Sequence, residues 1–163
     1  MTDSPSSSAP HVLVVEARFY PDIADELLQG AVQALEAAGA THERLSVPGA
    51  FEIPAAIAMA IAGQRLAAPE LEPPRAYDGF LALGCVIRGE TTHYDYVCGE
   101  SARGLMDLAC REKIALGYGI LTVENGKQAW ARARVSEKNK GGDAAHACLA
   151  MIALKRRFGL PAR

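Results

Sequence analysis

The chain has 163 residues, of which half are hydrophobic and 22% are charged, and this composition is typical of one globular domain with a single core. Seventeen basic and nineteen acidic residues leave a net charge of -2, so no global field attracts nucleic acid or an anionic membrane. Any anion site must therefore be local. The four cysteines are widely spaced with no C-x-x-C pair, which predicts reduced, mostly buried thiols and no zinc site.

The first ten residues, MTDSPSSSAP, are rich in serine and proline and lack the basic start and apolar middle of a signal peptide. We expect residues 1–10 to form a disordered tail and residues 11–163 to form a single domain. The longest nearly apolar stretch, 53–63, is too short to span a bilayer. The sequence thus predicts a cytoplasmic protein that does not bind membranes.

The run HVLVVEA at 11–17 is short, apolar and β-branched, as in strands that are buried on both faces of a parallel sheet. Pro21 and Asp22 then predict a turn and a helix cap, followed by the first-turn carboxylates of Asp25 and Glu26. Apolar residues recur every four positions from 23 to 35, and Gly39 stands where a C-terminal cap belongs. This segment predicts an amphipathic helix.

The same alternation continues to the end of the chain, with strands expected at 43–47, 80–87 and 118–123 and helices at 54–64, 94–113, 128–133 and 143–158. The Ala/Ile-rich helix at 54–64 could be buried nearly all round. Three prolines between 67 and 75 predict a surface loop. Strands alternating with helices favour a three-layer α/β/α sandwich with a four-stranded parallel sheet, in which ligands bind at the carboxyl ends of the strands.

The segment RGETTH at 88–93 follows a predicted strand and leads into a predicted helix. A flexible glycine, two hydroxyls and unpaired backbone amides at a helix start can hold a phosphate. The spacing from Gly84 to Gly89 resembles the start of a Walker A loop, but Glu90-Thr91 stands where Lys-Ser/Thr should follow, which argues against mononucleotide binding. Taken alone, the segment fits an ordinary strand-to-helix turn better than a ligand site.

An isolated histidine is more often a surface or capping residue than a catalyst, but the position of His93 after a strand favours a functional role. His11, His42 and His146 have no comparable setting, and no two histidines have the spacing of a zinc site on a helix. The sequence therefore indicates no metal.

Two features stay open when only the residues are considered. Glu52, in VPGAFEIP at 47–54, either binds sugar hydroxyls or complements the start of a helix. Four basic side chains lie close together in the sequence: Arg132, Arg134, Lys138 and Lys140. Either one of them binds an anion, or the cluster simply forms a solvent-exposed face, as most basic clusters do.

Taken together, four segments resemble the lumazine synthase family over about residues 11–158. They are ARF at 17–19 with LLQGA at 27–31; VPGAFEIP at 47–54; LGCVIRGETTHYDYV at 83–97; and YGILTVENGKQA at 118–129 with NKGGDAA at 139–145. The resemblance implies a flavodoxin-like strand order and a cofactor-free enzyme. It would condense 5-amino-6-(D-ribitylamino)uracil with 3,4-dihydroxy-2-butanone 4-phosphate to 6,7-dimethyl-8-ribityllumazine, phosphate and water, the penultimate step of riboflavin biosynthesis.

The resemblance also implies three groups of site residues. The pyrimidine and its ribityl chain would be bound by Phe19, Ala50, Phe51, Glu52, Cys85, Val86, Ile87, Tyr118 and Lys140. The phosphate would be bound by Glu90, Thr91 and Arg132. Protons would be transferred by His93, which Asp143 would orient or charge. Cys85 and Glu90 depart from the threonine and the small residue that are frequent in the family, so backbone contacts are expected at both positions.

In the family, residues matching Tyr118, Arg132 and Lys140 reach the site from a neighbouring subunit, so the resemblance implies a homo-oligomer, with riboflavin synthase as a candidate further partner. Shell-forming members carry a glycine-containing turn where this chain has RVSEKN at 134–139. We therefore expect a homopentamer, or at most two stacked pentamers. Two other interpretations stay open. The chain is a flavodoxin-like module that binds a flavin or nucleotide, or it is a protein without turnover, either a carrier of lumazine or flavin or a regulatory paralogue.

Overall fold

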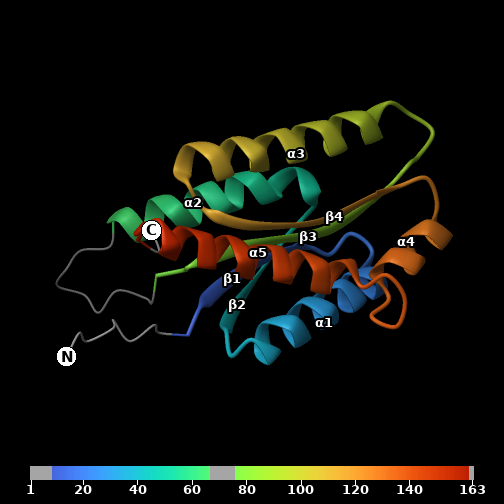
Figure 1. The fold of residues 1–163 in the computed structure, drawn as a ribbon. Helices are drawn as coiled ribbons and strands as arrows, with labels where there is room; N and C mark the ends of the chain where they lie inside the picture. The colour runs from blue at the N-terminus through green and yellow to red at the C-terminus, as the bar shows by residue number, and fades with distance from the viewer. Residues whose placement is uncertain (1–8, 67–75, 162–163) are drawn as a thin grey trace, which may run out of the picture.

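The computed structural model describes residues 9–66 and 76–161, in which strands and helices alternate as the sequence predicts (Figure 1). The elements are β1 (His11–Ala17), α1 (Pro21–Ala37), β2 (Thr41–Val47), a 3-10 turn η1 (Ala50–Glu52), α2 (Ile53–Leu66), β3 (Gly79–Ile87), α3 (His93–Glu112), β4 (Ala115–Val123), α4 (Gly126–Ala133) and α5 (Lys140–Arg157).

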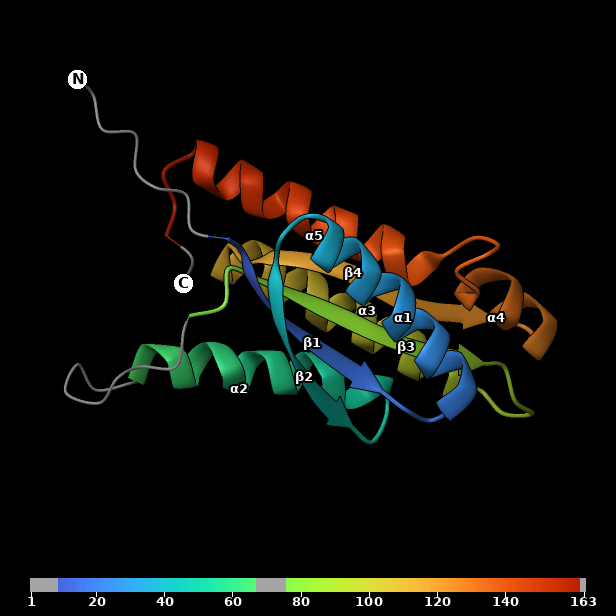
Figure 2. The same ribbon diagram turned by 90° about the horizontal axis from the view of Figure 1, so that it is seen from below.

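The four strands form one parallel sheet in the order β2-β1-β3-β4. Helices α2 and α3 cover one face, and α1, α4 and α5 cover the other, as Figure 2 shows. This confirms the predicted three-layer α/β/α sandwich with flavodoxin-like order. Because all strands run in one direction, their carboxyl ends meet at one edge of the sheet, where ligands of such folds bind.

Strand β1 lies in the middle of the sheet and is buried along its whole length. Its side chains alternate between the two cores. Val12 and Val14 pack toward α1 and α5, whereas Leu13 and Val15 pack toward α2. This two-sided burial explains why the run is continuously apolar instead of alternating with polar residues.

Helix α5 lies so close to its neighbours that two contact positions require glycine. A Cβ on Gly141 would stand 1.9 Å from the carbonyl oxygen of Leu27 in α1. A Cβ on Gly117 in β4 would stand 2.1 Å from the carbonyl oxygen of Ala144. The NKGG segment therefore has a packing role, because it fits the start of α5 against α1 and the sheet.

Several predicted details differ from the structure. Helix α1 begins at Pro21 with Tyr20 as its N-cap, so the prediction that Pro21 and Asp22 supply the cap was wrong. Asp22 is the acidic residue of the first turn, where Asp25 and Glu26 were expected. Gly39, with φ +70°, takes the predicted place after the helix end. Within this chain α2 buries only its Ile53, Ile57 and Ile61 stripe among the side chains described, so the expectation of all-round burial was also wrong.

The four cysteines are free thiols, but only Cys85 and Cys148 are buried. The prolines predicted to form a loop at 67–75, and most of the predicted tail, lie outside the described residues. No helix within the described ranges is long and apolar enough to cross a membrane.

Candidate active site

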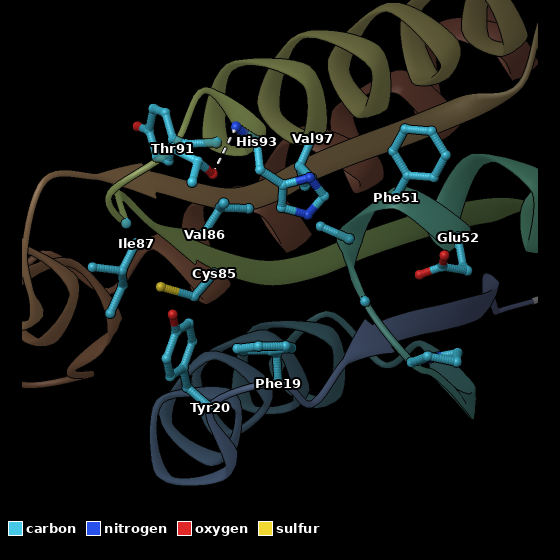
Figure 3. Close-up of a pocket in the computed structure, with 15 residues that line it drawn as sticks. Phe19, Tyr20, Phe51, Glu52, Cys85, Val86, Ile87, Thr91, His93 and Val97 are labelled. Atoms are coloured by element: carbon cyan, nitrogen blue, oxygen red, sulfur yellow. Dashed lines mark hydrogen bonds between the residues drawn. The ribbon is translucent and has the colours of Figure 1, made fainter.

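A cavity of about 500 Å³ opens at the carboxyl ends of β1, β2 and β3 and is bounded by the start of α3 (Figure 3). Its wall contains most of the residues that the sequence assigned to the site: Phe19, Ala50, Phe51, Glu52, Cys85, Val86, Ile87, Thr91 and His93. These residues come from four separate segments of the chain. The fold brings them together because each segment ends a strand, follows the end of a strand or begins the next helix.

Phe19 occupies the short connection between β1 and α1, and 69% of its surface is exposed. Its ring meets the edge of the Tyr20 ring, with centroids 5.0 Å apart. Figure 3 shows Phe19 and His93 approaching the cavity from opposite sides. A large aromatic ring exposed at the wall of a cavity offers a flat apolar surface on which a planar ligand can stack.

Strand β3 ends in the cavity at Cys85, Val86 and Ile87. Burial, reinforced by the neighbouring Cys98, raises the pKa of the Cys85 thiol to about 11. The thiol is therefore protonated near neutral pH and does not supply a thiolate nucleophile. The Cys85 side chain shapes the cavity wall, and the end of β3 presents its backbone groups there.

The loop after β3 is fixed from both of its sides. Arg88 donates a hydrogen bond from Nε to Glu124 Oε2 at the end of β4 (2.8 Å) and pairs with Asp95 in α3 through Nη1 (3.3 Å). His93 is the first residue of α3, and its backbone N–H donates to Thr91 Oγ1 (3.3 Å), the dashed line in Figure 3. The imidazole is thus carried on a rigid helix start instead of a loose loop.

Glu52 ends the 3-10 turn that follows β2. Its carboxylate turns back over Gly49, where a Cβ would stand 3.1 Å from Oε2. Glu52 and Thr91 lie well apart in Figure 3, with the His93 ring between them and Phe19 below. The cavity therefore has an acidic end, suited to hydroxyl groups, and a separate end with a hydroxyl and a helix start, suited to an anion.

The other predicted residues lie elsewhere in the chain. Tyr118, Lys140 and Asp143 line a second, shallower hollow on the edge strand β4 and the start of α5. Lys140 Nζ pairs with Asp143 Oδ2 at 2.7 Å. Within one chain, therefore, Asp143 is paired with Lys140 and does not line the cavity of His93.

Arg132 lies in the last turn of α4, where its Nη1 donates to the carbonyl oxygen of Gln128 (3.1 Å). It makes no ion pair with any residue of the described ranges, in contrast to Arg134, which pairs with Glu137 at 2.9 Å. Glu90 is exposed in the loop before α3 and does not line the cavity.

The sequence did not assign some residues that line the cavity: Tyr20, Pro48, Gly49, Gly89, Tyr94 and Val97. Each lies within four residues of an assigned one, so extending the strand-end segments would have found them. Across residues 9–66 and 76–161, no group of three or more His, Cys, Asp or Glu side chains could hold a metal ion.

A parallel α/β sandwich with an aromatic ring and a histidine facing a cavity at its strand ends defines a flavodoxin-like fold whose cavity offers a stacking surface to a planar ligand. Sequence comparison identifies the particular family. Residues 9–156 match the profile of 6,7-dimethyl-8-ribityllumazine synthase, and this chain belongs to that family. The finding confirms the resemblance, and the enzyme class, that the motifs predicted.

Close relatives agree with this assignment. The chain is 62% identical over 149 residues to 6,7-dimethyl-8-ribityllumazine synthase 1 of Rhizobium meliloti (strain 1021), covering 91% of this chain and 94% of the relative. It is 60% identical over 152 residues to the synthase of Agrobacterium fabrum (strain C58 / ATCC 33970), covering 93% and 99%. A synthase of Methylorubrum extorquens (strain PA1) is 58% identical over 168 residues, covering 99% and 93%.

Proposed function

We propose that this chain forms 6,7-dimethyl-8-ribityllumazine from 5-amino-6-(D-ribitylamino)uracil and 3,4-dihydroxy-2-butanone 4-phosphate, with release of phosphate and water. The observation that carries the proposal is that exposed Phe19 and His93 face one cavity from opposite sides, in a chain of the lumazine synthase family. The product belongs to riboflavin biosynthesis, and the reaction takes place in the cytoplasm.

In this proposal the pyrimidine ring stacks on Phe19, and its polar edge meets the backbone from Cys85 to Ile87. The ribityl chain runs toward Ala50, Phe51 and Glu52, where the carboxylate accepts hydrogen bonds from sugar hydroxyls. The exposure of Phe19 and Phe51, at 69% and 55%, supports this arrangement, because a bound ligand would cover both rings.

The butanone phosphate lies at the other end of the cavity, with its phosphate at the backbone amides of Glu90 and Thr91 near the start of α3. The Glu90 side chain points away, because a carboxylate beside a phosphate would repel it. The first-turn amides of α3 and the positive end of its dipole favour the anion.

The chemistry needs only proton transfers and positioning. The amine of the pyrimidine attacks the ketone, water leaves to give an imine, phosphate is eliminated, and the ribitylamino nitrogen closes the second ring with loss of another water. His93 accepts and returns the protons that these steps move. Holding two reactive partners in place can supply roughly 7 to 11 kcal/mol in favourable cases, so positioning carries much of the rate.

A second copy of the chain completes the site. Tyr118, Lys140 and Asp143 lie on the edge strand and at the start of α5, outside the cavity of their own chain, and Tyr118 is 44% exposed. Arg132 likewise has no acidic partner within the described residues. We propose that a neighbouring copy places Tyr118, Lys140 and Arg132 against the cavity, so that Arg132 clamps the phosphate in a ring of five chains.

Incubation of the purified protein with both substrates, followed by lumazine absorbance, tests this function. We expect turnover without any added cofactor. Binding of the pyrimidine or of lumazine without turnover would overturn the proposal in favour of a carrier, and binding of a flavin or nucleotide alone would favour a flavodoxin-like module.

A further inference from the structure

Glu16 is the only buried carboxylate among the described residues, with 1% of its surface exposed. It interrupts the apolar run of β1 one residue before the strand ends, and it faces the α1 side of the sheet like Val12 and Val14. A buried carboxylate is costly unless cations and hydrogen bonds compensate it. The side chains around Glu16 must therefore offset the cost of burying its charge.

Glu16 is compensated by side chains from two different segments. Its Oε1 accepts hydrogen bonds from Arg44 Nη2 (2.7 Å) and Ser46 Oγ (3.4 Å), both on β2. Its Oε2 accepts a hydrogen bond from Arg18 Nη1 (3.1 Å), which follows the end of β1. The carboxylate thus joins β2 to the connection that leaves β1.

Arg18 continues the chain of ion pairs into the next helix. Its Nη2 donates to Asp25 Oδ1 in α1, and this hydrogen bond, together with the charges of Asp25 and Glu16, raises the pKa of the guanidinium. Arg18 therefore tethers β1 to α1 across the connection that carries Phe19. Glu16 and Asp25 balance Arg18 and Arg44, so the network has no net charge.

Stability alone does not require this network. A well-packed apolar side chain in place of a buried ion pair is often as stable or more stable, and the residues of β1 on either side of Glu16 are apolar. What an apolar residue cannot supply is a directional tether for Arg18. Phe19 depends on such a tether, because its ring is mostly exposed and its edge-to-face contact with Tyr20 lies within the same β1–α1 connection.

We propose that Glu16 and Arg18 are positioning residues that hold the β1–α1 connection so that the Phe19 ring faces the cavity. The proposal rests on the proposed role of Phe19 as the surface on which the pyrimidine stacks. The pair acts on pyrimidine binding through Phe19, and it does not contact the region around Thr91 where the phosphate is proposed to bind.

The test uses Glu16→Gln, which keeps the size of the side chain, and Arg18→Ala. Arg103→Ala is the matched control, because Arg103 forms ion pairs with Glu100 and Asp107 on the surface of α3 and does not touch the β1–α1 connection. We expect both test variants to raise KM for the pyrimidine about tenfold, with kcat and KM for the butanone phosphate within about twofold of wild type. The control should change none of these.

A second readout does not depend on catalysis. The four phenylalanines can be replaced by para-fluorophenylalanine, and the Phe19 signal can be assigned by its loss in Phe19→Leu. We expect the Phe19 fluorine resonance to move toward the value of the free amino acid in Glu16→Gln and Arg18→Ala, while the resonance of Phe51 stays in place.

An unchanged Phe19 resonance and an unchanged pyrimidine KM in both variants would overturn the proposal. Equal increases in KM for both substrates would also overturn it, in favour of a purely structural role. If Glu16→Gln does not fold, the Arg18→Ala variant alone tests the proposal, because Arg18 is partly exposed and its replacement disturbs the core less. If the wild-type protein has no turnover, the proposed function fails, and the fluorine resonance still tests the positioning.

Discussion

The guanidinium carbon of Arg88 lies 4.1 Å from the centroid of the Tyr94 ring. The same side chain pairs with Glu124 at the end of β4 and with Asp95 in α3. Arg88 therefore links the loop that carries Thr91 to the end of β4 and to the first turn of α3, the helix that begins at His93. A planar guanidinium can stack on a ring and use its fork at the same time, which a lysine ammonium cannot.

Replacement of Arg88 by lysine should loosen this loop although the charge is kept. We expect kcat/KM for the butanone phosphate to fall about three- to tenfold, since misplacement of a positioned group lowers the rate. Steady-state kinetics with each substrate varied in turn would measure the change. Arg103→Lys, on the exposed surface of α3, is the control and should behave as wild type. Wild-type kinetics in Arg88→Lys would show that the contacts of the Arg88 guanidinium do not contribute to binding of the butanone phosphate or to turnover.

His93→Ala should slow turnover while substrate binding is retained. We expect a decrease of about ten- to a thousandfold, with the lower part of the range reflecting the intrinsic reactivity of the two substrates. Binding of the pyrimidine, measured by titration, should stay close to wild type because Phe19 and the end of β3 are unchanged. Full turnover of the variant across neutral pH would rule out His93 as the group that transfers protons.

The strands that the sequence predicted best are those whose two faces are both buried. Strand β1 has the predicted bounds, His11–Ala17, because its continuous apolar run leaves no other choice. Strand β2 begins two residues before the prediction, at Thr41. It is an edge strand whose side chains are mostly exposed, so polar residues there give no periodic signal.

Strand β4 begins three residues before the prediction, at Ala115, because Gly117 weakens the strand pattern. The structure explains the glycine: α5 packs so closely on β4 that a Cβ at this position would meet its backbone. Tertiary packing overrides local preference at this point, and no pattern along the chain could reveal it.

Part of the candidate site could also be predicted, since the rule that ligands bind at strand carboxyl ends pointed to the loops around Phe19, Glu52 and His93. Only the resemblance to the family then gave these three residues their expected roles. The placement of Asp143 beside Lys140 on the β4 side could not be predicted, because sequence order does not say which residues share one hollow. The role of Glu16 was missed, although an acid inside an apolar strand was a signal that could have been followed.

Gly141→Ala should destabilise the fold. The new Cβ would stand 1.9 Å from a backbone oxygen of Leu27, so α5 would have to move away from α1. We expect a loss of about 3 kcal/mol in the free energy of unfolding, at the upper end of usual overpacking effects. Denaturant unfolding measures it. Gly126→Ala, in the first turn of α4 with no atom within 4 Å of the new Cβ, is the matched control. Equal stabilities of the two variants would contradict this account of the close contact.

Arg132→Ala should chiefly weaken binding of the butanone phosphate. A bidentate contact between a guanidinium and a phosphate contributes roughly 1.5 to 3 kcal/mol, so we expect its KM to rise about ten- to a hundredfold. Pyrimidine affinity should stay nearly intact. Arg134→Ala, at the end of the same helix and paired with Glu137, is the control. Equal loss of affinity for both substrates would count against a phosphate clamp and for a structural role.

The resemblance to the family links the turn between α4 and α5 to assembly, because shell-forming members are expected to carry a glycine-containing turn at this position. In this chain two of the side-chain contacts that hold the turn 134–139 are the ion pair of Arg134 with Glu137 at 2.9 Å and the hydrogen bond that the Val135 N–H donates to Glu26 Oε2 in α1 at 3.1 Å. Only Asn139 has a positive φ, 43°, within the turn. The bend that glycines would permit is therefore not available at the other positions without strain.

We accordingly expect five copies of the 17.3 kDa chain to form a ring, or at most two such rings to stack. The ring needs apolar surface beyond the core of each chain, and α2 offers it, with Met59 72% exposed on the face of the helix away from the buried Ile57 and Ile61. Light scattering on dilute protein at neutral pH measures the assembly, and electron microscopy shows its shape. Hollow spherical particles would contradict the argument from the turn.

Met59→Glu tests whether the ring is formed through α2. If it is, this variant should yield smaller species and lose turnover, because Tyr118, Lys140 and Arg132 would no longer reach the cavity of a neighbour. A variant that stays a full ring with wild-type turnover would place the contact on another surface.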